Sequence, residues 1–141
     1  HMDRPAASAP FQRVHADLMG PITPSLPSAK EYVLVLTDEF TDYVWVYFLR
    51  RKSDAAEAIA TWHSLVRSQF TARVLEFHSD HGGEFVSNRL LAHWRSFGVI
   101  ASTTARNTPQ HNGVAERKNR TLMEAARAQL VQAGLCRNEK C

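Results

Sequence analysis

The chain has 141 residues, 44% of them hydrophobic and 22% charged, which fits one domain with its own core and excludes a compositionally disordered segment. It holds no run of about 20 apolar residues, so the sequence predicts no membrane-spanning helix. The net charge is +3, and the two cysteines lie at 136 and 141, too close together to cross-link the body of a fold.

The first third of the chain has the pattern of three strands. Residues 1–10 are mostly small residues and proline, and we expect a flexible leader whose first two residues look like the remnant of an expression tag. Residues 11–19 alternate between apolar and polar side chains, which predicts a short strand. Residues 32–37 and 43–49 are rich in β-branched and aromatic residues and flank a polar turn, which predicts an antiparallel hairpin.

A helix and a fourth strand follow. Ser53 is a suitable helix cap, and we expect the helix to run to about Phe70. Its apolar residues recur at helical spacing and predict an inner face made by Ala55, Ile59, Trp62 and Val66. Residues 74–78 predict a short strand.

The last part of the chain predicts two more helices around a fifth strand. Residues 84–97 carry one apolar stripe (Leu90, Leu91, Trp94 and Phe97) and end at Gly98. Residues 99–102 predict a strand, and residues 112–133 a helix capped by Asn112. The alternation of strands and helices predicts an α/β fold with a mixed sheet, followed by a short tail at 135–141.

Three acids stand out because of what surrounds them. Asp17 lies in the first predicted strand, Asp80 follows the fourth, and Glu116 lies near the start of the last helix, with 35 residues between the last two. A single acid is usually a solvated surface group. Three carboxylates brought together would repel each other unless they bound a divalent cation, and Mg²⁺ prefers such oxygen ligands.

Other polar and aromatic residues near these positions have ordinary explanations. We interpret Asp38 as a turn residue and Glu84 as an acid at a helix start. His81 is more typical of a surface histidine than of a metal ligand, because Mg²⁺ favours oxygen. The three tryptophans, Trp45, Trp62 and Trp94, fall on core-facing patterns and are predicted to pack.

The excess positive charge is concentrated around Glu116. Residues 105–127 hold five basic and two acidic residues, an excess that equals the whole net charge of +3. Such a segment would attract the negatively charged backbone of DNA. The other explanation that the pattern allows is a helix face exposed to solvent.

Four stretches, HADLMGPI, YVLVLTDEFTDYVWVYFL, HSDHGGEF and TPQHNGVAERKNRTLMEAAR, together resemble the catalytic core of retroelement integrases. This is the D,D(35)E family, and the resemblance is closest to the Ty1/copia type. It implies a ribonuclease H-like fold over residues 11–134, with a five-stranded mixed sheet flanked by helices. It also implies that Asp17, Asp80 and Glu116 are the catalytic residues and hold two Mg²⁺ or Mn²⁺ ions.

The same resemblance implies a function and partners. The expected reactions are 3′-end processing of element DNA and its strand transfer into target DNA, in the nucleus after a cytoplasmic particle stage. The DNA contacts it implies are Gln110, Asn112, Lys118, Asn119 and Arg120. Asn112 also serves as a plain helix cap. A homodimer or higher oligomer through the core is expected, with no membrane partner. A ribonuclease H-like nuclease and a non-catalytic DNA-binding or dimerisation module are the alternatives.

Overall fold

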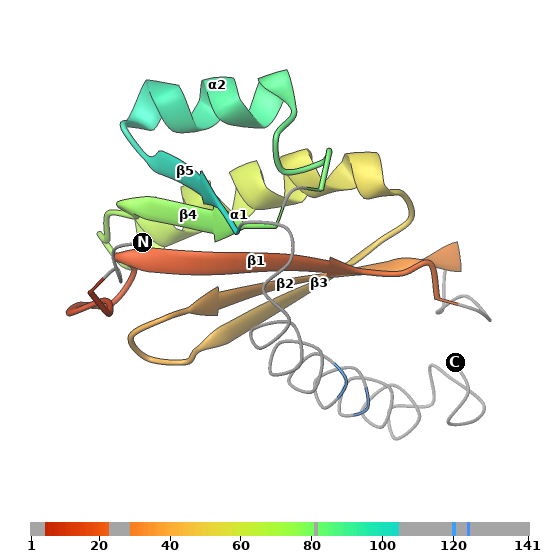
Figure 1. Cartoon of the computed structure of the whole chain (residues 1–141), viewed down its shortest axis with the longest axis horizontal. Helices are drawn as coiled ribbons and strands as arrows, with labels where there is room; N and C mark the ends of the chain where they lie inside the picture. Colours follow the sequence, from red (N-terminus) through yellow and green to blue (C-terminus); the bar gives the residue numbers. More distant parts are fainter. Residues whose placement is uncertain (1–4, 23–28, 81, 105–119, 121–123, 125–141) are drawn as a thin grey trace.

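The computed structural model describes residues 5–22, 29–80 and 82–104, together with Arg120 and Glu124. Its centre is the predicted five-stranded mixed sheet, in the order β3-β2-β1-β4-β5 (Figure 1). The strands are β1 (Arg13–Met19), β2 (Tyr32–Asp38), β3 (Val44–Leu49), β4 (Glu76–Ser79) and β5 (Ile100–Thr103). The helical elements are the 3-10 turn η2 (Lys52–Asp54) and the helices α1 (Ala55–Gln69) and α2 (Asn88–Phe97).

The sheet changes from antiparallel to parallel at β1. The predicted hairpin forms between β2 and β3, and β2 also pairs antiparallel with β1. On the other side of β1, the pairs β1–β4 and β4–β5 are parallel. Parallel neighbours need a crossover connection, and α1 and α2 supply the connections into β4 and β5. The mixed α/β sheet is confirmed.

Helices α1 and α2 cover one face of the sheet and build the main core with it (Figure 1). The predicted inner face of α1 is confirmed, since Ala55, Ile59, Trp62 and Val66 are each 0% exposed. In α2, Leu90 and Trp94 are buried, whereas Phe97 at the end of the predicted stripe is partly exposed. Trp62 and Trp94 pack in the core as predicted, and Trp45 packs against it from β3.

The starts of both helices differ from the predictions. Ser53 does not cap α1: it lies inside η2, and Asp54 Oδ2 instead accepts the N–H of Arg51 at 3.1 Å. Helix α2 begins at Asn88, where Ser87 Oγ accepts the N–H of Leu90 at 3.3 Å. The interpretation of Glu84 as a helix-start acid is therefore wrong, because Glu84 precedes the cap. Gly98 ends α2 as predicted, in the left-handed conformation with φ 69°.

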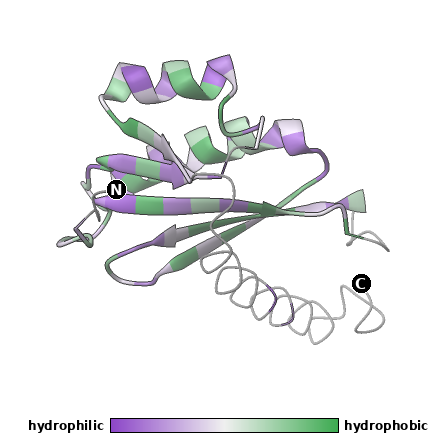
Figure 2. Cartoon of the chain, viewed as in Figure 1, coloured by the Kyte–Doolittle hydropathy of each residue, from purple (hydrophilic) through white to green (hydrophobic). Residues whose placement is uncertain are grey.

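The face of the sheet opposite the helices is apolar on β2 and polar on β1. On β2, Leu34 and Leu36 join the main core, while Val33 and Val35 form a second apolar cluster with Ile22. Strand β1 instead alternates between hydrophilic and hydrophobic residues, as its colouring shows (Figure 2). On β1, Val14 and Ala16 belong to the main core, so Arg13, His15 and Asp17 point to the second face. No helix in the described part of the chain is long and apolar enough to span a bilayer.

Candidate active site on the polar face of the sheet

The parallel pair β1–β4 brings two of the three predicted acids together. In this pair Arg13 lies opposite Glu76, and His15 opposite His78. Continuing the same register by two residues places Asp17 beside Asp80, which directly follows the end of β4. Neighbouring strands lie about 4.8 Å apart, so adjacent carboxylates on one face of such a pair can share a cation.

The side chains show that these residues face the same side of the sheet. Arg13 Nε is 2.6 Å from Glu76 Oε2, and the rings of His15 and His78 meet edge to face with centroids 5.1 Å apart. We call these contacts, with Asp17 and Asp80 as the next pair, the polar ladder. Because side chains on a strand alternate, every second residue of β1 and β4 contributes to it.

A tight turn holds Asp80 at the end of the ladder. Its Oδ1 accepts the N–H of Gly82 at 2.9 Å. A Cβ atom added to Gly82 would lie 2.5 Å from Glu84 Oε1 and 3.0 Å from Asp80 Oδ1. The Glu84 carboxylate therefore lies close to Asp80, and both lie next to the Gly82 Cα. The absence of a side chain at Gly82 leaves room for both acids.

His78 ties the ladder to the edge strand β5. Its Nδ1 is 2.7 Å from Ser102 Oγ, and its Nε2 is 2.7 Å from Thr104 Oγ1. The backbone N–H of Thr104 also donates to Ser79 O at 2.9 Å. These bonds fix the path of the chain at the end of β5.

Glu39 anchors the other end of the ladder. Its carboxylate is 2.7 Å from His15 Nε2 and 2.8 Å from Arg13 Nη1, and it accepts the N–H of Ala7. Burial would raise the pKa of Glu39, but the hydrogen bonds from His15, Ala7 and Arg13 outweigh it and lower that pKa to about 2. Neighbouring Asp38 has the predicted turn role, since its Oδ2 accepts the N–H and hydroxyl of Thr41.

This pKa makes a stability test possible. The ionised Glu39 stabilises the fold above the ordinary pKa of 4.5, and that contribution is lost as the pH falls from about 4.5 toward 2. We expect the urea midpoint of the wild-type chain to fall more steeply across this window than that of Glu39→Gln, which lacks the contribution at every pH. The matched control is Glu31→Gln at an exposed position. Parallel pH curves for wild type and Glu39→Gln would contradict this assignment.

The other predicted site residues lie mostly outside the described residues. This applies to Glu116, to the DNA contacts Gln110, Asn112, Lys118 and Asn119, and to His81. Arg120 is described as an exposed helical residue, which agrees with the predicted helix over 112–133 at that position. The roles of all these residues stay predictions.

The described side chains fit part of a divalent-cation site. Within the described ranges, no three His, Cys, Asp or Glu side chains form a complete metal-binding group. Asp17 and Asp80 offer only oxygen donors, which suits Mg²⁺ or Mn²⁺. On β2, the residue paired with Asp17 is Val35, which belongs to the second apolar cluster. The predicted third donor, Glu116, lies outside the described residues.

A family model described as the integrase core domain matches residues 7–109, which include Asp17, Asp80 and the whole polar ladder. This chain belongs to the integrase core domain family. The predicted family is thus confirmed over most of the chain. The matched range ends before Glu116, so the match itself does not reach the third predicted acid.

Curated relatives confirm the Ty1/copia type. The chain is 34% identical over 122 residues to the retrovirus-related Pol polyprotein from transposon TNT 1-94 of Nicotiana tabacum, covering 86% of the chain and 9% of the relative. It is 36% identical over 128 residues to the transposon Ty1-NL2 Gag-Pol polyprotein of Saccharomyces cerevisiae, covering 89% and 7%. The chain thus spans less than a tenth of the length of these relatives.

Solved structures confirm the ribonuclease H-like fold. The catalytic core domain of BIV integrase aligns over 92% of this chain and 76% of its own, with a TM-score of 0.61 at 20% identity. The HTLV-2 integrase catalytic core domain, solved in complex with magnesium in a trimeric form, aligns over 93% and 77%, with a TM-score of 0.65 at 18% identity. A simian T-cell lymphotropic virus intasome in complex with PP2A regulatory subunit B56 gamma aligns over 94% and 45%, with a TM-score of 0.68 at 17% identity.

Proposed function

We propose that this integrase core catalyses metal-dependent 3′-end processing and strand transfer of element DNA. The observation that supports the proposal is the parallel β1–β4 register in a member of this family: it runs to His15 and His78, and its continuation by two residues would pair Asp17 with Asp80. Both acids lie on the face opposite α1 and α2, where no described helix covers them. A DNA strand could approach the two carboxylates from that side.

Asp17, Asp80 and Glu116 are the proposed ligands of two Mg²⁺ or Mn²⁺ ions. Such ions, when bound, activate an attacking oxygen and stabilise a leaving one. The chain itself holds the carboxylates in place. Asp17 lies on β1, between Val35 of β2 and the neighbouring strand β4. The Gly82 N–H donates to Asp80 and orients its carboxylate. Phosphoryl transfer depends mainly on such positioning and charge.

DNA and further copies of the chain are the proposed partners. The names of the relatives describe transposon polyproteins, and the structural neighbours include an intasome and a trimeric core with magnesium. Gln110, Asn112, Lys118, Asn119 and Arg120 are the proposed DNA contacts, and Arg120 is exposed as that role requires. Action on chromosomal DNA would take place in the nucleus, after a cytoplasmic particle stage.

A joining assay tests this function. The chain is incubated with a labelled duplex carrying an element end, in MgCl₂ or MnCl₂, and the products are resolved on a denaturing gel. We expect products longer than the substrate, which report strand transfer, and their loss when EDTA removes the metal. A strand shortened at one fixed site near its 3′ end reports end processing, whereas cuts at many positions without longer products would instead identify a nuclease of the same fold. Joining that persists in EDTA would contradict a metal-dependent mechanism.

A further inference from the structure

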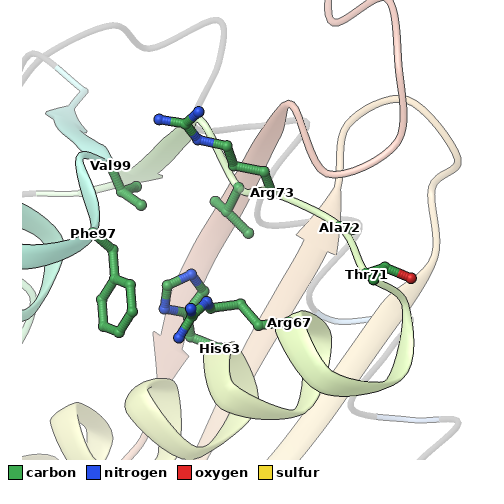
Figure 3. Close-up of a pocket in the computed structure, with 8 residues that line it drawn as sticks. His63, Arg67, Thr71, Ala72, Arg73, Phe97 and Val99 are labelled. Atoms are coloured by element: carbon green, nitrogen blue, oxygen red, sulfur yellow. The ribbon is translucent and has the colours of Figure 1, made fainter.

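A cavity lies away from the polar ladder, on the side of the sheet that α1 and α2 cover. It has a volume of about 350 Å³ and is lined by His63, Arg67, Thr71, Ala72, Arg73, Val74, Phe97 and Val99. These residues come from the end of α1, the segment that leads into β4, and the α2–β5 connection (Figure 3). Val74 and Val99 precede β4 and β5, whereas Asp80 follows β4, so the cavity lies at the other end of these strands.

Two positive groups line the cavity, and no described residue supplies a counter-ion for them. Arg67 and Arg73 both line it, and no acidic side chain of the described residues does. Neither arginine forms an ion pair with a carboxylate in the described part of the chain, whereas Arg13 forms two. The C-terminal end of α1 favours a cation at Arg67. Arg73 lies outside any helix, but its Nη2 lies near Gly98 at the C-terminal end of α2, which favours a cation there in the same way.

The cavity wall holds one arginine in place. Arg67 Cζ lies 4.3 Å from the centroid of the Phe97 ring, a cation–π contact that limits where the guanidinium can move. Behind it, His63 is buried, and its Nδ1 lies 2.9 Å from His93 Nε2. Figure 3 shows His63 and Arg67 together on α1, Phe97 and Val99 across the cavity, and Arg73 beyond them.

The histidine pair beside the cavity is shifted by burial and by neighbouring positive charge. Burial, followed by the charges of His93 and Arg67, lowers the pKa of His63 to about 4. The pKa of His93 is lowered too, by burial and then by Arg67 and Arg89. Burial is the larger cause of both shifts, and the positive charge of Arg67 adds to it at each histidine.

We propose that this cavity binds a carboxylate that is carried on an apolar group. A carboxylate is planar and matches the fork of an arginine guanidinium. The walls formed by Ala72, Val74, Phe97 and Val99 suit an apolar body next to that charge. A strongly hydrated phosphate of a DNA backbone would gain nothing from such walls.

The test is a titration followed by the side-chain Nε–Hε NMR signals of the arginines, with the whole chain. Phenylacetate and the capped peptide Ac-Leu-Glu-Leu-NH₂ are compared with their neutral analogues phenylacetamide and Ac-Leu-Gln-Leu-NH₂, and with a short DNA duplex. We expect both carboxylates to shift the signals of Arg67 and Arg73, and the neutral analogues to leave them unchanged. Tighter binding of the peptide identifies a protein segment as the source, and tighter binding of phenylacetate a free small acid.

Variants decide whether the cavity is the site. Arg67→Gln and Arg73→Gln should each weaken carboxylate binding by at least about tenfold. Both side chains are exposed, so the fold should tolerate the changes. Arg50→Gln, an exposed position at the end of β3, removes the same charge elsewhere and should leave binding unchanged.

Three results would overturn the proposal. The neutral analogues could bind as tightly as the carboxylates, Arg50→Gln could weaken binding as much as the cavity variants do, or only DNA could shift the arginine signals. The proposal is independent of the catalytic function. Asp80→Asn should bind the carboxylates as the wild type does, whatever its effect on DNA joining.

Discussion

Replacing Asp80 by Asn is expected to lower metal-dependent strand transfer by about three orders of magnitude or more. The change keeps the size of the side chain and its ability to accept the Gly82 N–H bond, but it removes one of two charges that the β1–β4 register sets side by side. Asp17→Asn should have the same effect for the same reason. Gel quantification of joined products in MgCl₂ and MnCl₂ measures it.

The fold of Asp80→Asn should be intact. Without metal, removing one of two neighbouring negative charges relieves repulsion, so the melting temperature should equal or exceed that of the wild type. Added Mg²⁺ or Mn²⁺ should raise the melting temperature of the wild type and not of the variant, because only the wild type binds the ion in its folded state. Glu57→Gln, at an exposed position on α1, is the control and should keep wild-type joining. Wild-type joining by Asp80→Asn would refute the proposed metal site.

Trp94→Ala is expected to cause the largest loss of stability, about 3–5 kcal/mol in the free energy of unfolding. The side chain is 1% exposed, and its ring centroid lies 4.7 Å from that of Phe77 on β4. Alanine would leave a cavity between α2 and the strand that leads to Asp80. Urea unfolding followed by circular dichroism gives the change in the midpoint and in the free energy.

A second variant separates packing from hydrogen bonding at this position. The indole Nε1 of Trp94 is buried and has no hydrogen-bond partner among the described residues. Trp94→Phe removes that unpaired donor and keeps an aromatic ring, so its cost should be well below that of alanine. If both variants lost the same free energy of unfolding, packing of the aromatic ring could not be the source of the loss.

The sequence predicted the sheet because period-two alternation and β-branched residues mark strands directly. It also predicted the inner face of α1, since residues at helical spacing became fully buried. The ends of the helices were harder to predict from the sequence, because several polar residues near each end could cap the helix. Ser53 and Ser87 are both suitable caps by residue type, and only Ser87 accepts the bond.

In the candidate site, the motif around Asp80 indicated where to look but not how the acids are held. The positions of His15 and His78, each two residues before an acid, could have revealed the polar ladder through strand alternation. Glu39 could not have been found that way, because its contacts join a loop to β1 across 24 and 26 residues. The proximity of Glu84 to Asp80 depends on the turn at Gly82, whose conformation no periodicity encodes.

The parallel pairing of β1 with β4 also has a consequence for folding kinetics. The two strands are neighbours in space, but the hairpin strands, η2 and α1 all lie between them in the chain. Contacts of such long sequence separation form slowly, because a long loop must close before they stabilise anything. The antiparallel meander of β1, β2 and β3 can assemble from local contacts alone. During synthesis, a nascent chain that ends before β4 would therefore hold Asp17 without Asp80, and the proposed metal site could form only after the long loop has closed.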